Sequence, residues 1–147
     1  MRTFVVVTLL ALSTAASSTS LGDAATAPIT VAVSGLRSSK GKVGCALFTG
    51  PRGFPKDPNA ASQRLWCKID QGAATCAFEP VAAGTYAVAC FHDENDNGKI
   101  DTGLFGIPTE GTVVSNHAKG TFGPPKYDDA KFAFSAQPMT LALRMGY

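Results

Sequence analysis

Apolar and polar residues alternate with a period of two in seven short stretches of the chain. This period is typical of a strand that buries one of its faces. No sustained helical period appears elsewhere, so the chain is predicted to be built from strands. The seven stretches are residues 29–36, 43–49, 64–70, 74–79, 86–92, 130–136 and 139–145.

Turn-forming residues separate these stretches. Residues 50–62, for example, contain three prolines and two glycines and are predicted to form a loop. Short strands joined by such turns predict an all-β fold, here a seven-stranded antiparallel β-sandwich. One long loop, residues 101–130, follows the fifth strand, and within it a short strand at 112–115 and a helical turn at 127–130 are expected.

The start of the chain has a different pattern. Arg2 is followed by an apolar run, Phe4 to Leu12, and then by the small residues Ser13 to Ser20. This order is typical of a cleavable export signal, and the apolar run is too short to cross a bilayer. The alternative, a first strand of the domain, is disfavoured because the residues behind the run do not alternate. Residues 1–25 are therefore predicted to be a signal peptide.

The remaining residues, 26–147, suit a single β-sandwich domain. The position of cleavage stays open, because Ala15, Ala16 and Ala25 all have small neighbours that a signal peptidase accepts. A cleaved export signal predicts a periplasmic or secreted protein. No cysteine near the signal offers a site for a lipid, since the first cysteine is Cys45.

Charge excludes two classes of partner. The chain has 13 Lys and Arg against 11 Asp and Glu, a formal net charge of +2, and contains no run of basic residues. Such a balance predicts neither nucleic-acid binding nor binding to an anionic membrane. No segment behind the signal is long enough to be membrane-inserted. The partners that remain are a glycan, a peptide or a protein of the cell envelope.

The chain contains four cysteines, and the predicted export indicates which chemistry they have. An even number of cysteines in an oxidising compartment predicts disulfides, and no C-x-x-C pair suggests zinc or redox chemistry. If Gln71 and Gly72 form a two-residue turn, Cys67 and Cys76 lie opposite each other on antiparallel strands. The predicted disulfides are therefore Cys67–Cys76 and, by elimination, Cys45–Cys90.

Oxygen-bearing side chains stand at alternate positions in residues 91–103, FHDENDNGKIDTG, directly behind a predicted strand. Calcium takes about six to eight oxygen ligands, which a coiled loop supplies from alternate positions with a glycine at the sixth, here Gly98. The segment therefore predicts calcium as a cofactor. The expected ligands are the side chains of Asp93, Asn95, Asn97 and Asp101, the carbonyl of Lys99, and Glu110 as a distant carboxylate.

The segment is not an EF-hand. Its twelfth position is Leu104 instead of glutamate, and a strand precedes it instead of a helix. Two amides in place of acids predict weak binding, in the range of about 10⁻⁴ to 10⁻³ M. A metal-free loop of Asx turns has the same residue types, since Asn-Gly is a strong turn dipeptide. Both interpretations stay open from the sequence.

Neither histidine completes a catalytic constellation, and no nucleophile elbow, zinc-protease motif or phosphate loop is present. No catalytic residue is assigned, and a binding or structural module of the envelope, stabilised by calcium, is the favoured function. The alternative is a small extracytoplasmic hydrolase that uses the polar long loop around His117. The expected binding surface consists of Phe105, Pro108, His117, Phe122 and Tyr127, which would otherwise form a satellite core.

Three segments carry a resemblance to a known family. They are GTYAVACFHDENDNGKIDTGLFGIPTEG, SNHAKGTFGPPKYDDAKFAF and the closing LALRMGY. From about residue 29 to 147 the chain resembles the exported bacterial proteins grouped as domain of unknown function 2141. It departs from them at Val113 and Val114, where the family usually has glycine and an aromatic residue. The resemblance implies a transthyretin-like, immunoglobulin-like or carboxypeptidase-regulatory-like sandwich and no assigned activity.

Overall fold

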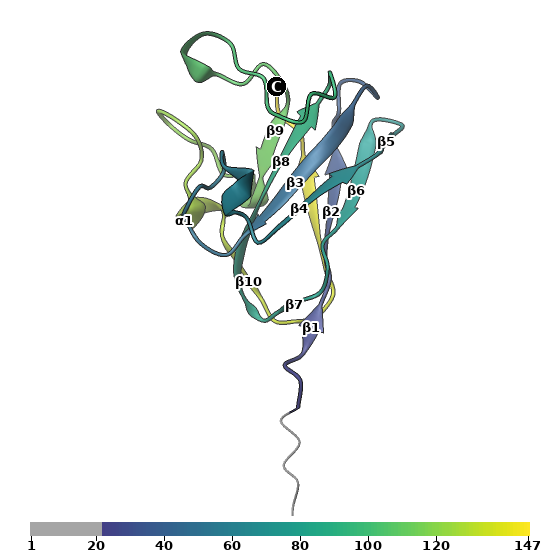
Figure 1. The fold of residues 1–147 in the computed structure, drawn as a ribbon, viewed down its shortest axis with the longest axis vertical. Helices are drawn as coiled ribbons and strands as arrows, with labels where there is room; N and C mark the ends of the chain where they lie inside the picture. Colours follow the sequence, from purple (N-terminus) through teal and green to yellow (C-terminus); the bar gives the residue numbers. More distant parts are fainter. Residues whose placement is uncertain (1–21) are drawn as a thin grey trace, which may run out of the picture.

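The structure, a computed structural model, describes residues 22–147 and is all-β (Figure 1). Residues 1–21, most of the predicted signal peptide, lie outside the described residues. The first strand among the described residues, β1, is Thr26–Ala27. No helix among residues 22–147 is long and apolar enough to span a membrane.

Two larger sheets and one short strand pair make up the domain. The first sheet has the order β10-β8-β3-β4, with β9 paired to β8, and the second has the order β11-β2-β6-β5. The strands of the first are β10 Phe132–Phe134, β8 Gly84–Asp93, β3 Lys42–Phe48, β4 Gln63–Cys67 and β9 Thr112–Val114. Those of the second are β11 Met139–Arg144, β2 Ile29–Ser34, β6 Ala73–Ala77 and β5 Ile69–Asp70. β1 pairs with β7, Val81–Ala82.

Four short helical turns lie between the strands. They are η1 Pro58–Ala60, η2 Leu104–Gly106, η3 Ser115–His117 and α1 Tyr127–Ala130. Three of them belong to the long loop predicted at 101–130. The short strand and the helical turn expected within that loop are both present, as β9 and α1.

The described residues form eleven strands, not seven. Each of the seven predicted stretches forms a strand, but residues 64–70 are divided at Lys68 into β4 and β5, which join different sheets. The other additions are β1, β7 and β9, which are too short to show a period. One pairing also departs from the antiparallel prediction, because β11 runs parallel to β2. Alternation reports which face of a strand is buried, not which strand lies beside it.

The main core lies between the two large sheets and includes Ile29, Leu47 and Phe78, each almost fully buried. A second apolar cluster covers the opposite face of β3 and β8. It joins Phe48 to Tyr127, with Phe54 packed edge-on against both rings at 5.2 and 5.8 Å. β3 is therefore buried on both faces, and the long loop contributes to the packing of the domain.

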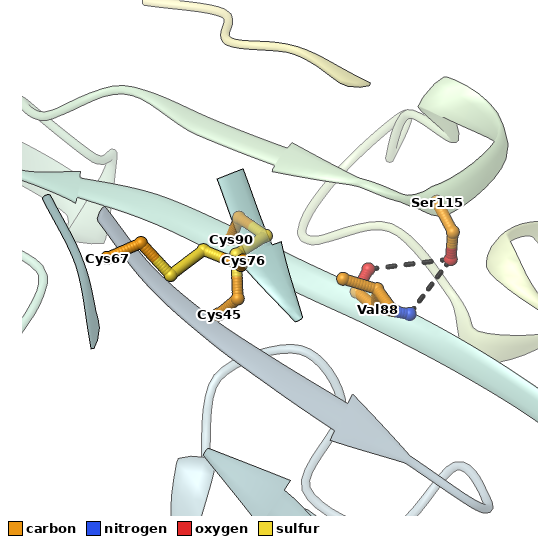
Figure 2. The surroundings of a disulfide bond; sticks show 6 residues. All are labelled: Cys45, Cys67, Cys76, Val88, Cys90 and Ser115. Carbon is orange, nitrogen blue, oxygen red and sulfur yellow. Dashed lines mark hydrogen bonds between the residues drawn. A yellow bond between two sulfur atoms is a disulfide. The ribbon is translucent and has the colours of Figure 1, made fainter. Parts of the chain in front are cut away.

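Both predicted disulfides are present (Figure 2). Cys45 and Cys90 lie directly opposite each other on β3 and β8, with Cα atoms 4.2 Å apart. Cys67 on β4 and Cys76 on β6 belong to different sheets, so the second disulfide joins the two layers of the sandwich.

Candidate functional site

Asp93 ends β8 and begins the polar loop. Its side chain is fully buried, and its two carboxylate oxygens accept hydrogen bonds from the backbone N–H groups of Asn97 (3.0 Å) and Gly98 (2.8 Å). Gly98 has a φ of +80°, a left-handed conformation that suits glycine. The carboxylate therefore closes the tight bend, at the position where the sequence predicts the first calcium ligand.

Asp101 lies against the two asparagines of the loop. The amide nitrogens of Asn95 and Asn97 both donate to its carboxylate, the second at 2.9 Å. The amide oxygens accept backbone N–H groups, that of Asn95 from Asn97 (3.2 Å) and that of Asn97 from Lys99 (3.0 Å). Four predicted ligands thus converge on one small region, and they do so as a set of Asx turns.

Glu110 joins the two ends of the loop, as the sequence predicts for a distant carboxylate. It is buried, with 6% of its surface exposed, and it accepts from the backbone N–H groups of Glu94 and Asp101, each at 2.9 Å. Arg37, which the sequence analysis did not identify, binds the same region from outside. Its guanidinium contacts the Glu94 carboxylate and donates to the carbonyl of Thr109 (3.2 Å).

The donor set of this loop fits calcium in part. Its side chains offer hard oxygens, each carboxylate oxygen has a further lone pair, and the amides can turn their oxygens inward by rotating about one bond. Every carboxylate oxygen of Asp93, Asp101 and Glu110 already accepts a hydrogen bond. No group of three His, Cys, Asp or Glu side chains suited to a metal occurs within residues 22–147. The loop therefore holds its bend through protein contacts.

His92 precedes the loop and is fully buried. One ring nitrogen, Nε2, lies 2.8 Å from the carbonyl of Lys40, which only accepts, so Nε2 carries the proton. The other, Nδ1, lies 2.7 Å from the hydroxyl of Tyr147 and accepts from it. Both nitrogens of His92 are thus engaged in tying the end of the chain to the sandwich.

Tyr147 is expected to lose its proton late in an alkaline titration. Burial raises its pKa above the ordinary value of about 10, against a smaller opposing effect of the Arg37 backbone N–H. The folded state then keeps a proton that the unfolded state releases, so the stability of the domain falls as the pH rises above about 10. Tyrosinate absorbance measures this titration, and Tyr147→Phe is expected to remove one late component. A single transition of all tyrosines at the ordinary pKa would contradict the assignment.

The predicted binding surface is only partly exposed. Phe105 and Phe122 are almost completely exposed, with relative exposures of 91% and 103%, and Pro108 is exposed as well. Tyr127 was wrongly placed on this surface. It is 8% exposed, belongs to the second apolar cluster, and donates its hydroxyl to the carbonyl of Thr85 (3.2 Å). Its ring fills the space between α1 and the sheet.

His117 lies at the surface, but one of its ring nitrogens is occupied. Nε2 accepts the backbone N–H of Arg144 at 3.1 Å, which fixes the ring against β11. A shallow hollow in the same loop is lined by residues 119–124, Lys126 and Asp129 and does not include His117. His117 therefore lies outside this hollow, with its Nε2 bonded to the backbone of β11.

Ser115 is a buried polar residue that the sequence analysis missed. Its hydroxyl accepts the N–H of Val88 (2.9 Å) and donates to the carbonyl of Ala130 (2.6 Å), as Figure 2 shows in part. The long loop is thereby hydrogen-bonded to β8 and to α1. A serine behind two valines gives no signal that it will be buried, because the partners come from distant segments.

Comparison with known proteins gives one match. A sequence model of the family described as "Uncharacterized protein conserved in bacteria (DUF2141)" matches residues 31–142. The match covers more than half of the chain and includes the polar loop and both disulfides. No curated protein and no solved structure matches the chain.

Proposed function

Because the chain belongs to the DUF2141 family of bacterial proteins, whose description gives no activity, we propose a function from the geometry of its own residues. The protein is an exported binding or structural module of the cell envelope, with a transthyretin-like sandwich and a polar loop that calcium stabilises. The observation that carries this proposal is the convergence of Asp93, Asn95, Asn97 and Asp101 at the end of β8.

Export is supported by the disulfides and by the start of the chain. Disulfides form and persist in oxidising compartments, and both pairs here join strands within a small domain. The basic and apolar start, residues 1–25, has the order of an export signal. A periplasmic or secreted location agrees with both features.

Calcium is supported by the way in which Asp101 is held. Its carboxylate is contacted by two neutral amides, which supply partial positive charge where a cation would supply a full one. With calcium bound, the amides of Asn95 and Asn97 are expected to rotate and present their oxygens. Because the amides must give up hydrogen bonds to do so, the affinity is low, about 10⁻⁴ to 10⁻³ M, as in extracellular modules.

The role of the ion is to hold residues 102–110 in place. This segment leaves the loop at Asp101 and returns at Glu110, where Glu110 accepts the Asp101 N–H and the Thr109 N–H donates to the Asp101 carbonyl (3.0 Å). A cation bound to Asp101 thereby adds to the stability of the whole segment. The binding surface proposed for the module begins here.

The proposal predicts that calcium raises the melting temperature of the protein and that two substitutions reduce this rise. Asn95→Ala removes an oxygen ligand, and Asp101→Asn removes a negative charge. Each substitution is expected to weaken calcium binding about tenfold or more. Titration calorimetry in chelated and calcium-loaded buffers gives the affinity. Thermal unfolding in the same two buffers gives the linked stabilisation.

Asp96→Asn provides the matched control. Asp96 lies in the same loop, but its carboxylate contacts only Lys42 and is largely exposed. Its substitution is expected to leave the calcium effect unchanged. If calcium gives no heat of binding at millimolar concentration, or if all three variants respond alike, the loop is a set of Asx turns without a metal.

A further inference from the structure

Two loop tips carry the four most exposed large apolar side chains among the described residues. We propose that these tips dock the protein on the surface of an anionic phospholipid bilayer. The first tip, the finger, is residues 102–109, and the second tip is residues 119–125. Their exposed apolar residues are Leu104, Phe105, Ile107 and Phe122, with relative exposures of 77%, 91%, 63% and 103%.

Three backbone N–H groups of the finger donate within the finger. Gly103 donates to the carbonyl of Ile107 (2.8 Å), Ile107 to that of Leu104 (3.4 Å), and Gly106 to that of Gly103 (3.3 Å). Residues 102–109 contain no charged side chain. A tip of this kind suits the boundary between lipid headgroups and acyl chains, where apolar side chains are buried and water still reaches the remaining backbone N–H groups.

Phe105 has a left-handed backbone conformation, with a φ of +58°. This conformation is uncommon for a bulky residue, and glycine or asparagine would adopt it at less cost. The ring of Phe105 lies almost entirely in solvent, so packing within the domain does not explain the choice of residue. Burial of the Phe105 ring in a surface outside the domain would explain why a phenylalanine occupies this position.

The second tip combines an apolar side chain with basic neighbours. Lys119 and Lys126 flank Phe122 and line with it a hollow of about 450 Å³, to which Asp129 contributes the one acidic side chain. Residues 111–127 contain no acidic residue. The hollow thus suits the phosphate of a lipid headgroup, while the ring of Phe122 suits the acyl region next to it.

A bilayer fits these tips better than a folded partner does. Both tips project to the upper left of Figure 1, away from β1, which lies at the opposite end of the domain. Projecting apolar tips need a matching groove on a protein, whereas a fluid interface accepts them without one. The small net charge hides the basic character of the second tip, because Lys119 and Lys126 are separated along the chain.

Vesicle sedimentation tests the proposal on the chain recovered after export. The docking proposal rests on the proposed export but not on calcium, so binding to vesicles is measured in the presence of a chelator. Mass spectrometry of the N-terminus checks export separately. Vesicles of phosphatidylcholine alone are compared with vesicles that also contain phosphatidylglycerol. The wild-type protein is expected to partition into the second kind, and less strongly as salt is added.

Three variants separate the contributions. Leu104→Ser, Phe105→Asn and Ile107→Ser together are expected to lower partitioning at least tenfold. Each lysine near a membrane surface contributes about fivefold, so K119E/K126E is expected to lower it about 25-fold or more on anionic vesicles. K40E/K68E makes the same change of charge at exposed positions outside both tips and is expected to change partitioning about twofold or less.

Either of two vesicle results would overturn the proposal. They are wild-type protein that stays in the supernatant with both kinds of vesicle, and a finger variant that binds as well as the wild type. Sedimentation velocity without lipid adds a third outcome. A dimer that the finger variant loses would assign the tips to a second copy of the chain instead.

Discussion

Asp93→Ala is expected to lower the free energy of unfolding by about 2–4 kcal/mol, measured in chelator. The Asp93 carboxylate is fully buried and pairs the backbone N–H groups of Asn97 and Gly98. Alanine removes the acceptor of the Gly98 N–H, leaves the Asn97 N–H with only its longer bond to the Asn95 amide oxygen (3.2 Å), and leaves a void behind the bend. Hydrogen bonds to a charged acceptor are about twice as strong as neutral ones, which places the loss above that of an ordinary surface change.

Urea denaturation measures this loss, and the substitution is expected to shift the midpoint without a change in slope. Asp96→Asn is the control, because the largely exposed Asp96 carboxylate contacts only Lys42 and asparagine tolerates the left-handed backbone at this position, with a φ of +59°. An exposed ion pair of this kind contributes little, so the control is expected to lose about 0.5 kcal/mol or less. Equal losses in the two variants would show that the buried carboxylate does not hold the loop.

This experiment also separates the two interpretations of the polar loop. Asp93 acts on the backbone with or without an ion, so its variant is destabilised in chelator. Asn95 is different, because it lies at the surface of the loop and contacts only loop residues. A substitution of Asn95 that leaves the free energy of unfolding unchanged in chelator but lowers it in calcium would indicate a cation site.

The positions of the strands were predictable from the sequence, because one face of each is buried in the sandwich. The assignment of strands to sheets was not. The turn at Gln71 and Gly72 was predicted correctly, since Ile69 pairs with Ala74 in the expected register. The chain crosses to the other sheet at Lys68, however, and Cys67 is therefore paired with Val43 instead of with a residue of β6. The predicted disulfide forms across the sandwich instead of along a hairpin.

The polar loop was predictable in its residues but not in its contacts. Alternating oxygen-bearing side chains identify the segment, and Glu110 was correctly placed beside it. The sequence does not show that each carboxylate is already paired with N–H groups. Tyr127 illustrates the converse error, because an aromatic residue in a long loop gives no indication of whether another segment covers it. Here Phe54, from residues 50–62, lies against its ring.

The loop, the finger and the end of the chain form one connected unit. Arg37 contacts Glu94 and the carbonyl of Thr109, and its guanidinium lies 4.4 Å from the centre of the Tyr147 ring. Tyr147 in turn bonds His92, the residue before Asp93. Loosening of the bend at Asp93 is therefore expected to reach both the base of the finger and the chain end, because they share these contacts.

Removal of the two disulfides is expected to give losses of different size. In the chain-entropy account, the stabilisation grows with the length of the loop that a disulfide closes. The sequence separations of 45 for Cys45–Cys90 and 9 for Cys67–Cys76 correspond to about 4 and about 2.6 kcal/mol. All four cysteines are buried, so alanine at either pair adds a similar cavity cost and leaves the order of the two losses unchanged.

Urea denaturation of C45A/C90A and C67A/C76A, each under oxidising conditions, measures the two losses. The first variant is expected to be the less stable, although its disulfide joins strands that are already hydrogen-bonded neighbours. The second loses the disulfide between the sheets. If this variant is the less stable, the constraint on the unfolded chain is not the dominant effect. The disulfide between β4 and β6 would then act by holding the folded layers together, and the estimate from loop length would fail for this sandwich.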